Sequence, residues 1–110
     1  AVRGALPWVS NLGPDHVFGT VFEVEGEPSR RVMFIADCAT DGVSIQACPG
    51  FVALDGTATY SVQFRDAFVP DAKVLSDPVD GYLKKIRAGF VLLQTGMGLG
   101  VIRDCIDLMR

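Results

Sequence analysis

The sequence predicts a mainly β protein, an antiparallel barrel or sandwich followed by one long α-helix. In the first two-thirds of the chain, short apolar or alternating runs are separated by turn residues, which is typical of antiparallel strands. After Pro70 the apolar residues recur at steps of three and four, the period of a helix. We therefore expect a β-domain over residues 1–76, and a linker with the helix over residues 77–110.

The composition favours a folded domain. The chain has 110 residues, of which 49% are hydrophobic and 21% charged, so a core is possible and disorder is not indicated. The net charge is −3 and the basic residues are scattered, which argues against a nucleic-acid partner. The three cysteines have no zinc-site spacing, and their odd number in a chain without a signal peptide predicts reduced thiols and a cytoplasmic protein.

The expected strands follow in order along the chain. Leu6 to Ser10 is a short apolar run that ends in a turn, and Val17 to Val24 has apolar residues on both faces, as in a strand covered on both sides. A hairpin connection over residues 25–29 leads to the return strand, Val32 to Ala36. Val43 to Ala47 alternates as a half-buried strand does.

The clearest strand of the sequence follows the stop at Cys48-Pro49-Gly50. Period-two alternation covers residues 57–64, with Tyr60, Val62 and Phe64 on one face and Thr57 and Thr59 on the other.

From Tyr82 onward the pattern is helical. Its apolar positions are Leu83, Ile86, Phe90, Leu93, Met97, Val101, Cys105 and Leu108. The uncharged stretch from Ala88 to Ile102 has 15 residues by its numbering, fewer than the roughly 20 that span a bilayer, so we expect a core helix and no membrane. Such a helix needs partners that this chain lacks. The chain starts without Met in a strand-like run and stops at Arg110 within the helical pattern, so we expect a fragment of a longer protein.

Two conspicuous features do not indicate a site. Gly96-Met97-Gly98-Leu99-Gly100 has Val101 where a dinucleotide fingerprint needs its third glycine, and no strand precedes it. Since a glycine costs roughly 1 kcal/mol inside a helix, we expect these glycines to allow a close helix contact. His16, the single histidine, lies in a turn with no nucleophile partner, so neither triad chemistry nor a metal site is predicted.

Two short segments carry the functional prediction. Trp8-Val9-Ser10-Asn11 places an indole, a hydroxyl and an amide at a strand end. Some fifty residues later Phe64-x-Asp66-x-x-Val69-Pro70 closes a strand, and Gly81-Tyr82 opens the helix. In their order and spacing these segments resemble the acyl-CoA dehydrogenase family, over nearly the whole chain from Leu6 to the last helix. The resemblance implies the β-barrel middle domain of that family and the first helix of its C-terminal bundle.

The resemblance also implies a cofactor and two site residues. The cofactor is FAD, with the side chain of Trp8 packed on the isoalloxazine and the hydroxyl of Ser10 hydrogen-bonded near flavin N5, the hydride acceptor. The implied activity is α,β-dehydrogenation of an acyl-CoA thioester in fatty acid metabolism, and the implied assembly is a homotetramer. No catalytic residue is assigned in this chain, because the family's base lies further along, and we expect these 110 residues alone not to catalyse.

Two alternatives remain open. The first is a flavin-dependent monooxygenase or oxidase of the same fold. It stays open because the family often has an arginine that binds the CoA nucleotide at the position where this sequence has Gly89. The second is a β-barrel interaction module without catalytic activity.

Overall fold

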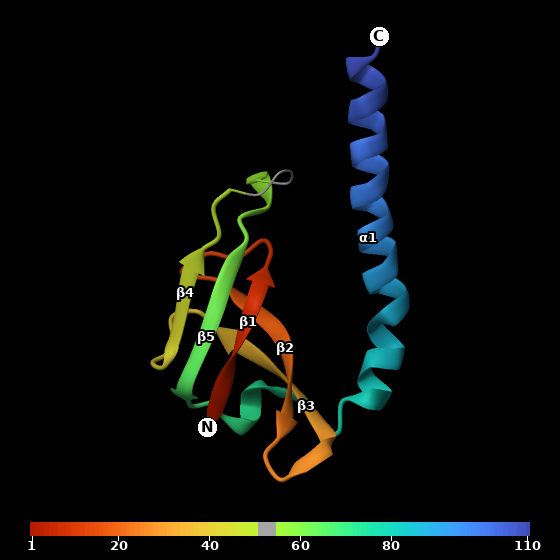
Figure 1. Ribbon diagram of the computed structural model, residues 1–110. Helices are drawn as coiled ribbons and strands as arrows, with labels where there is room; N and C mark the ends of the chain where they lie inside the picture. The colour runs from red at the N-terminus through yellow and green to blue at the C-terminus, as the bar shows by residue number, and fades with distance from the viewer. Residues whose placement is uncertain (51–54) are drawn as a thin grey trace. The chain divides into compact units, whose positions relative to one another are not determined.

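The structure is a computed structural model that describes residues 1–50 and 55–110. The chain divides into two compact units, Ala1–Pro78 and Val79–Arg110, and each is described by itself. The first unit is rich in strands and the second consists of one helix (Figure 1).

Three strands of the first unit form one antiparallel sheet in the order β1-β5-β4. They are β1 (Val2–Val9), β5 (Tyr60–Ala67) and β4 (Val43–Ala47). Val9 of β1 and Ala47 of β4 both pair with Tyr60, so the end of β1, the end of β4 and the start of β5 meet at one place. The pairing of β1 with β5 is interrupted by irregularities, including one between Leu6 and Val9.

The other described sheet has the order β2-β3-β6 and is also antiparallel. It contains β2 (Val17–Val24), β3 (Glu27–Asp37) and the short β6 (Val74–Ser76). Gly26 has a positive φ of 79° in the tight turn between β2 and β3, a conformation that glycine adopts without steric cost.

The core of the first unit draws on both sheets. Its buried residues are Leu12, Phe34, Ala36, Cys38, Val62, Phe64 and Ala67. The ring of Phe22 meets the ring of Phe64 edge to face with 5.1 Å between centroids, and Phe34 lies 5.7 Å from Phe22. Tilted and edge-to-face arrangements are the favoured geometry of aromatic pairs, so this cluster fixes the relative position of β2, β3 and β5.

The prediction of a β-rich chain with a C-terminal helix is confirmed, but the sheets are open and do not close into a barrel. Closure requires ladder pairing between the two sheets, and the described strands pair only within their own sheet. The expectation that β2 is covered on both sides is wrong at Val17, whose exposed fraction is 60%, because the face of β2 that carries Val17, Gly19 and Glu23 is exposed.

Several strand boundaries and one element also differ from the prediction. β1 covers Val2–Val9 where the strand was expected from Leu6 to Ser10, and β3 covers Glu27–Asp37 where it was expected from Val32 to Ala36. The expected strand over 57–64 starts only at Tyr60, because Ala58 has a positive φ of 46° and Thr57 lies in a 3-10 turn. That strand continues to Ala67, and β6 was not predicted, because three residues are too few to show a period.

The second unit contains α1 (Asp80–Leu108). None of the residues of α1 is buried, whereas Val79, directly before the helix, is buried. A Cβ built on Gly89, Gly96, Gly98 or Gly100 meets no atom within 4 Å, so the close contact expected at these glycines is not made within the described residues. By length and composition α1 also satisfies the criteria for a membrane-crossing helix, with a mean hydropathy of 1.2 over its most apolar window. Core helices of soluble proteins satisfy the same criteria, so the expected absence of a membrane stays a prediction.

Candidate functional site

Trp8 lies in the last part of the β1 pairing and Ser10 follows directly after Val9, the last residue of β1, so both residues lie at the same end of the strand. The side chain of Trp8 is 72% exposed although it is the largest apolar side chain of the protein. Ser10 is exposed as well. The structure therefore presents an indole and a hydroxyl together at the surface, and it does not place the indole in the core.

The hydroxyl of Ser10 belongs to a short chain of hydrogen bonds. Its Oγ lies 2.9 Å from Oγ1 of Thr59, and Oγ1 of Thr59 lies 2.8 Å from Oγ1 of Thr57. Thr57 and Thr59 are half-buried, whereas Ser10 is at the surface, so this chain of hydroxyls runs from partial burial outward.

The backbone around these hydroxyls is held by hydrogen bonds on both sides. Asn11 N donates to Thr57 O over 2.7 Å, which continues the pairing of β1 and β5 beyond the end of β1. Cys48 N donates to Thr59 O over 3.0 Å, which joins the end of β4 to the same place. Side chains carried by a hydrogen-bonded scaffold of this kind have a fixed geometry, as a binding site requires.

Asn11 adopts a positive φ of 58°, a conformation that asparagine tolerates better than most residues. Its carbonyl oxygen lies 3.1 Å from Nδ1 of His16. The asparagine of the Trp-Val-Ser-Asn segment therefore has a structural explanation: it allows the chain to turn directly after Ser10.

Three carboxylates of the first unit have lowered pKa values, and none of them belongs to the Trp-Val-Ser-Asn segment. Hydrogen bonding to Arg3 lowers the pKa of Asp66, and hydrogen bonding to Arg30 lowers the pKa of Asp77. The backbone N–H of Ala39, followed by the side chain of Lys73, lowers the pKa of Asp37.

Burial raises the pKa of the Cys38 thiol, so this cysteine is held as an unreactive core residue. Among the described residues no three His, Cys, Asp or Glu side chains come together in a group that could hold a metal ion.

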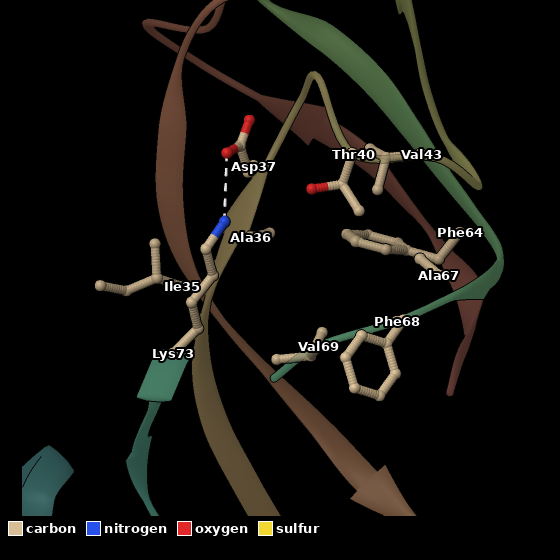
Figure 2. A pocket seen from close by; sticks show the side chains of 10 residues that line it. All are labelled: Ile35, Ala36, Asp37, Thr40, Val43, Phe64, Ala67, Phe68, Val69 and Lys73. Carbon is tan, nitrogen blue, oxygen red and sulfur yellow. Dashed lines mark hydrogen bonds and ion pairs between the residues drawn. The ribbon is translucent and has the colours of Figure 1, made fainter. Parts of the chain in front are cut away.

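The first unit has two recesses that differ in size. Figure 2 shows the smaller one, where Phe64, Val69 and the ion pair of Lys73 with Asp37 (3.1 Å) surround a space of about 10 Å³, room for about one water molecule. The larger is an open groove of about 940 Å³ between the start of β1 and the hairpin of β2 and β3. Neither Trp8 nor Ser10 lines either recess, so these two residues form an open surface.

The residues present fit one face of an isoalloxazine. An exposed indole offers a flat apolar surface, and an anchored hydroxyl beside it offers a hydrogen bond to the polar edge of a planar ring. An open surface of this kind can supply only one wall, because a ligand pocket normally encloses most of its ligand.

Sequence reasoning named Trp8 and Ser10 but missed Thr57 and Thr59. Both threonines lie on the polar face of the alternating segment, where hydroxyl residues are common in solvated strands. The pairing of Val9 with Tyr60 brings Thr59 next to Ser10, and such a register cannot be read from either segment alone. The one available signal was the Thr-x-Thr spacing, which places both hydroxyls on one side of an extended chain.

A scan against protein-family models finds no model that matches the chain, and a search of curated proteins finds no matching sequence.

Proposed function

We propose that this chain supplies one wall of the flavin site of an FAD-dependent oxidoreductase similar to the acyl-CoA dehydrogenases. The proposal is supported by the resemblance of its sequence segments and by one structural observation. That observation is the exposed indole of Trp8 two residues before the hydrogen-bonded hydroxyl of Ser10 at a strand end.

In this proposal each residue has a defined task. FAD, when bound, supplies the hydride acceptor. Trp8 covers one face of the ring and excludes water from it, because the indole exchanges its own exposed apolar surface for contact with the ring. Ser10 orients the ring through a hydrogen bond at its polar edge. The base that removes the α-proton of an acyl-CoA thioester is not assigned to this chain.

The first experiment is a titration of the chain with FAD. Trp8 is the single tryptophan, so quenching of its emission reports FAD bound near this residue. We expect saturable quenching, which Trp8→Leu removes by design and Ser10→Ala weakens. Because the chain supplies one wall, the deciding result comes from the protein that contains it: if that protein folds and takes up no FAD, the proposal is contradicted.

The second experiment identifies the reaction. The protein that contains this chain is mixed anaerobically with an acyl-CoA. A dehydrogenase bleaches its flavin, whereas a monooxygenase of the same architecture keeps the flavin oxidised until a separate reductant is added. Turnover by the 110-residue chain with added FAD contradicts the expectation that this chain alone is inactive.

A second candidate function, an interaction module without catalytic activity, is favoured by α1. None of the 29 residues of this helix is fully buried and its apolar middle is exposed, and exposed apolar surface of this extent is typical of protein contacts. Sedimentation of the chain with and without FAD separates the two candidates. Association without any flavin uptake supports the module, and flavin uptake supports the oxidoreductase. We expect a homo-oligomer in either case.

A further inference from the structure

We propose that the open groove between the start of β1 and the hairpin of β2 and β3 binds an extended peptide that alternates apolar and basic side chains, and that this peptide adds a strand to the free edge of β2. The groove has a volume of about 940 Å³. Neither Trp8 nor Ser10 lines it, so the inference is independent of the proposed flavin site.

β2 has one edge that is free to pair. In the described sheet β2-β3-β6 it stands at the edge and pairs through β3 alone. That pairing has a regular register from Val17 to Glu23, so backbone N–H and C=O groups face the other edge at regular intervals. β1, which also borders the groove, contains Pro7, and proline has no N–H to donate. β2 contains no proline and is therefore the edge that accepts an added strand.

The two faces of β2 determine which side chains the added strand needs. Successive side chains of a strand point to opposite faces. Phe22 and Val24 are half-buried and line the groove, whereas Glu23 between them is exposed. Val32 and Val69 also line the groove with apolar surface. An added strand follows this alternation, so its apolar side chains lie beside Phe22 and Val24, and the intervening side chains lie beside Glu23.

The charges that line the groove favour basic side chains at these intervening positions. Arg3 forms an ion pair with Asp66, so these two charges balance each other. Glu23 and Glu25 also line the groove, and neither forms an ion pair within the part of the chain that the structure describes. The hydrogen bond to Asp66 raises the pKa of Arg3, and the charge of Glu25 adds to this rise. Lysine or arginine in a bound peptide would therefore complement the two carboxylates that have no partner.

The test is a titration with a synthetic peptide. The probe alternates valine with lysine over about seven residues, an ordinary length for a strand, and carries a fluorescein label. Fluorescence anisotropy measures its affinity for the 110-residue chain. We expect saturable binding of a single peptide to each chain. A probe whose anisotropy stays constant up to about 1 mM chain overturns the proposal.

Two altered peptides identify the mode of binding. In the first, glutamate replaces lysine, and repulsion by Glu23 and Glu25 should weaken binding at least about tenfold at low salt. In the second, the backbone nitrogens are methylated, which keeps the side chains but removes the donors that strand addition uses. We expect this peptide also to bind at least about tenfold more weakly, because several hydrogen bonds are lost. Equal affinity of the methylated peptide overturns strand addition.

Two substitutions locate the site on the protein. Glu23→Gln and Glu25→Gln should each weaken binding of the probe about twofold to fivefold, the usual effect of one exposed ion pair, and both together should weaken it further. Asp41→Asn is the matched control, because it removes an exposed carboxylate that does not line the groove. An equal effect of Asp41→Asn overturns the assignment, since it means that the probe responds only to the net charge of the chain.

Three further measurements address the other occupants and the flavin. Spermine is cationic but has no peptide backbone, so displacement of the probe by spermine as readily as by unlabelled peptide overturns strand addition. Sedimentation shows whether Glu23→Gln and Glu25→Gln promote self-association of the chain, which would assign the groove to a second copy and overturn the proposal. Trp8→Leu should bind the probe like the wild type, because Trp8 does not line the groove. Failure of this inference and failure of the flavin proposal are therefore separate results.

Discussion

The ring of Phe22 lies directly against the α-carbon of Gly4, where β1 approaches β2. A Cβ added to Gly4 would be 2.8 Å from Cε1 of Phe22, closer than nonbonded carbon atoms normally come. Gly4 also has a φ of 151°, which side-chain-bearing residues rarely adopt. Phe22 cannot easily move away, because its ring also packs against Phe34 and Phe64.

We therefore expect Gly4→Ala to destabilise the first unit by about 1–3 kcal/mol, the usual range for overpacking and backbone strain. Urea unfolding followed by circular dichroism measures this free energy. Gly56→Ala is the matched control, because a Cβ at Gly56 meets no atom of the described residues within 4 Å and its backbone φ is not in the positive range. Equal effects of the two substitutions would contradict the close approach of Gly4 and Phe22.

Phe64 and Phe68 allow a second comparison within one segment. The side chain of Phe64 is 3% exposed and belongs to the aromatic cluster, whereas that of Phe68 is 71% exposed. Removing a buried phenylalanine side chain costs about 3–5 kcal/mol, so we expect Phe64→Ala to lower the free energy of unfolding by that amount. Phe68→Ala should change it by less than about 0.5 kcal/mol. A large loss with Phe68→Ala would show that this exposed ring is covered in solution.

The pair of Arg30 and Asp77 predicts a pH dependence. Arg30 donates from Nε and Nη2 to the two carboxylate oxygens of Asp77 over 2.9 and 2.6 Å, and this contact lowers the pKa of Asp77 below its ordinary value of 3.8. Since the folded pKa is the lower one, the stabilisation is complete above the unfolded pKa and is lost as the pH falls through the folded pKa.

We expect Asp77→Asn to be less stable than the wild type at pH 7, and the difference to shrink below about pH 4. Urea unfolding over a series of pH values measures it. Asp41→Asn, at an exposed carboxylate, is the control and should show a smaller difference at pH 7. A wild-type advantage over Asp77→Asn that is constant down to pH 2 would be inconsistent with the ion pair.

Trp8 is expected to matter for binding and not for stability. Because its indole is exposed, Trp8→Ala should change the free energy of unfolding by less than about 0.5 kcal/mol. The same substitution should weaken FAD binding about tenfold or more, since stacking contributes about 1 kcal/mol beyond the area that it buries. Flavin fluorescence measures the affinity in the absence of tryptophan. A loss of stability without any change in FAD affinity would show that Trp8 stabilises the fold and does not contribute to FAD binding.

Much of the fold was predictable because local patterns determined it. The bounds of β2 and β4 match the expected residues, since apolar runs between turn residues define such strands well. The helix was predictable from Tyr82 onward for the same reason. The start of β5 was not, because the positive φ of Ala58 interrupts an alternating pattern that itself shows no break.

The site was only half predictable. An indole and a hydroxyl two residues apart predicted Trp8 and Ser10, but whether the indole is buried or exposed depends on which face of β1 the core covers. The hydroxyl partners depend on the register of β1 against β5, which places Thr59 beside Ser10 across 49 residues of sequence. Pairings over such separations arise from tertiary packing and leave no local pattern.

The lack of burial along α1 has a calorimetric consequence. The heat-capacity increment of unfolding scales with the apolar area that becomes hydrated. Apolar residues of α1 that a second copy of the chain covers will add to this increment, beyond the contribution of the sheets and their aromatic cluster. The increment should therefore rise with protein concentration if the chain associates through α1.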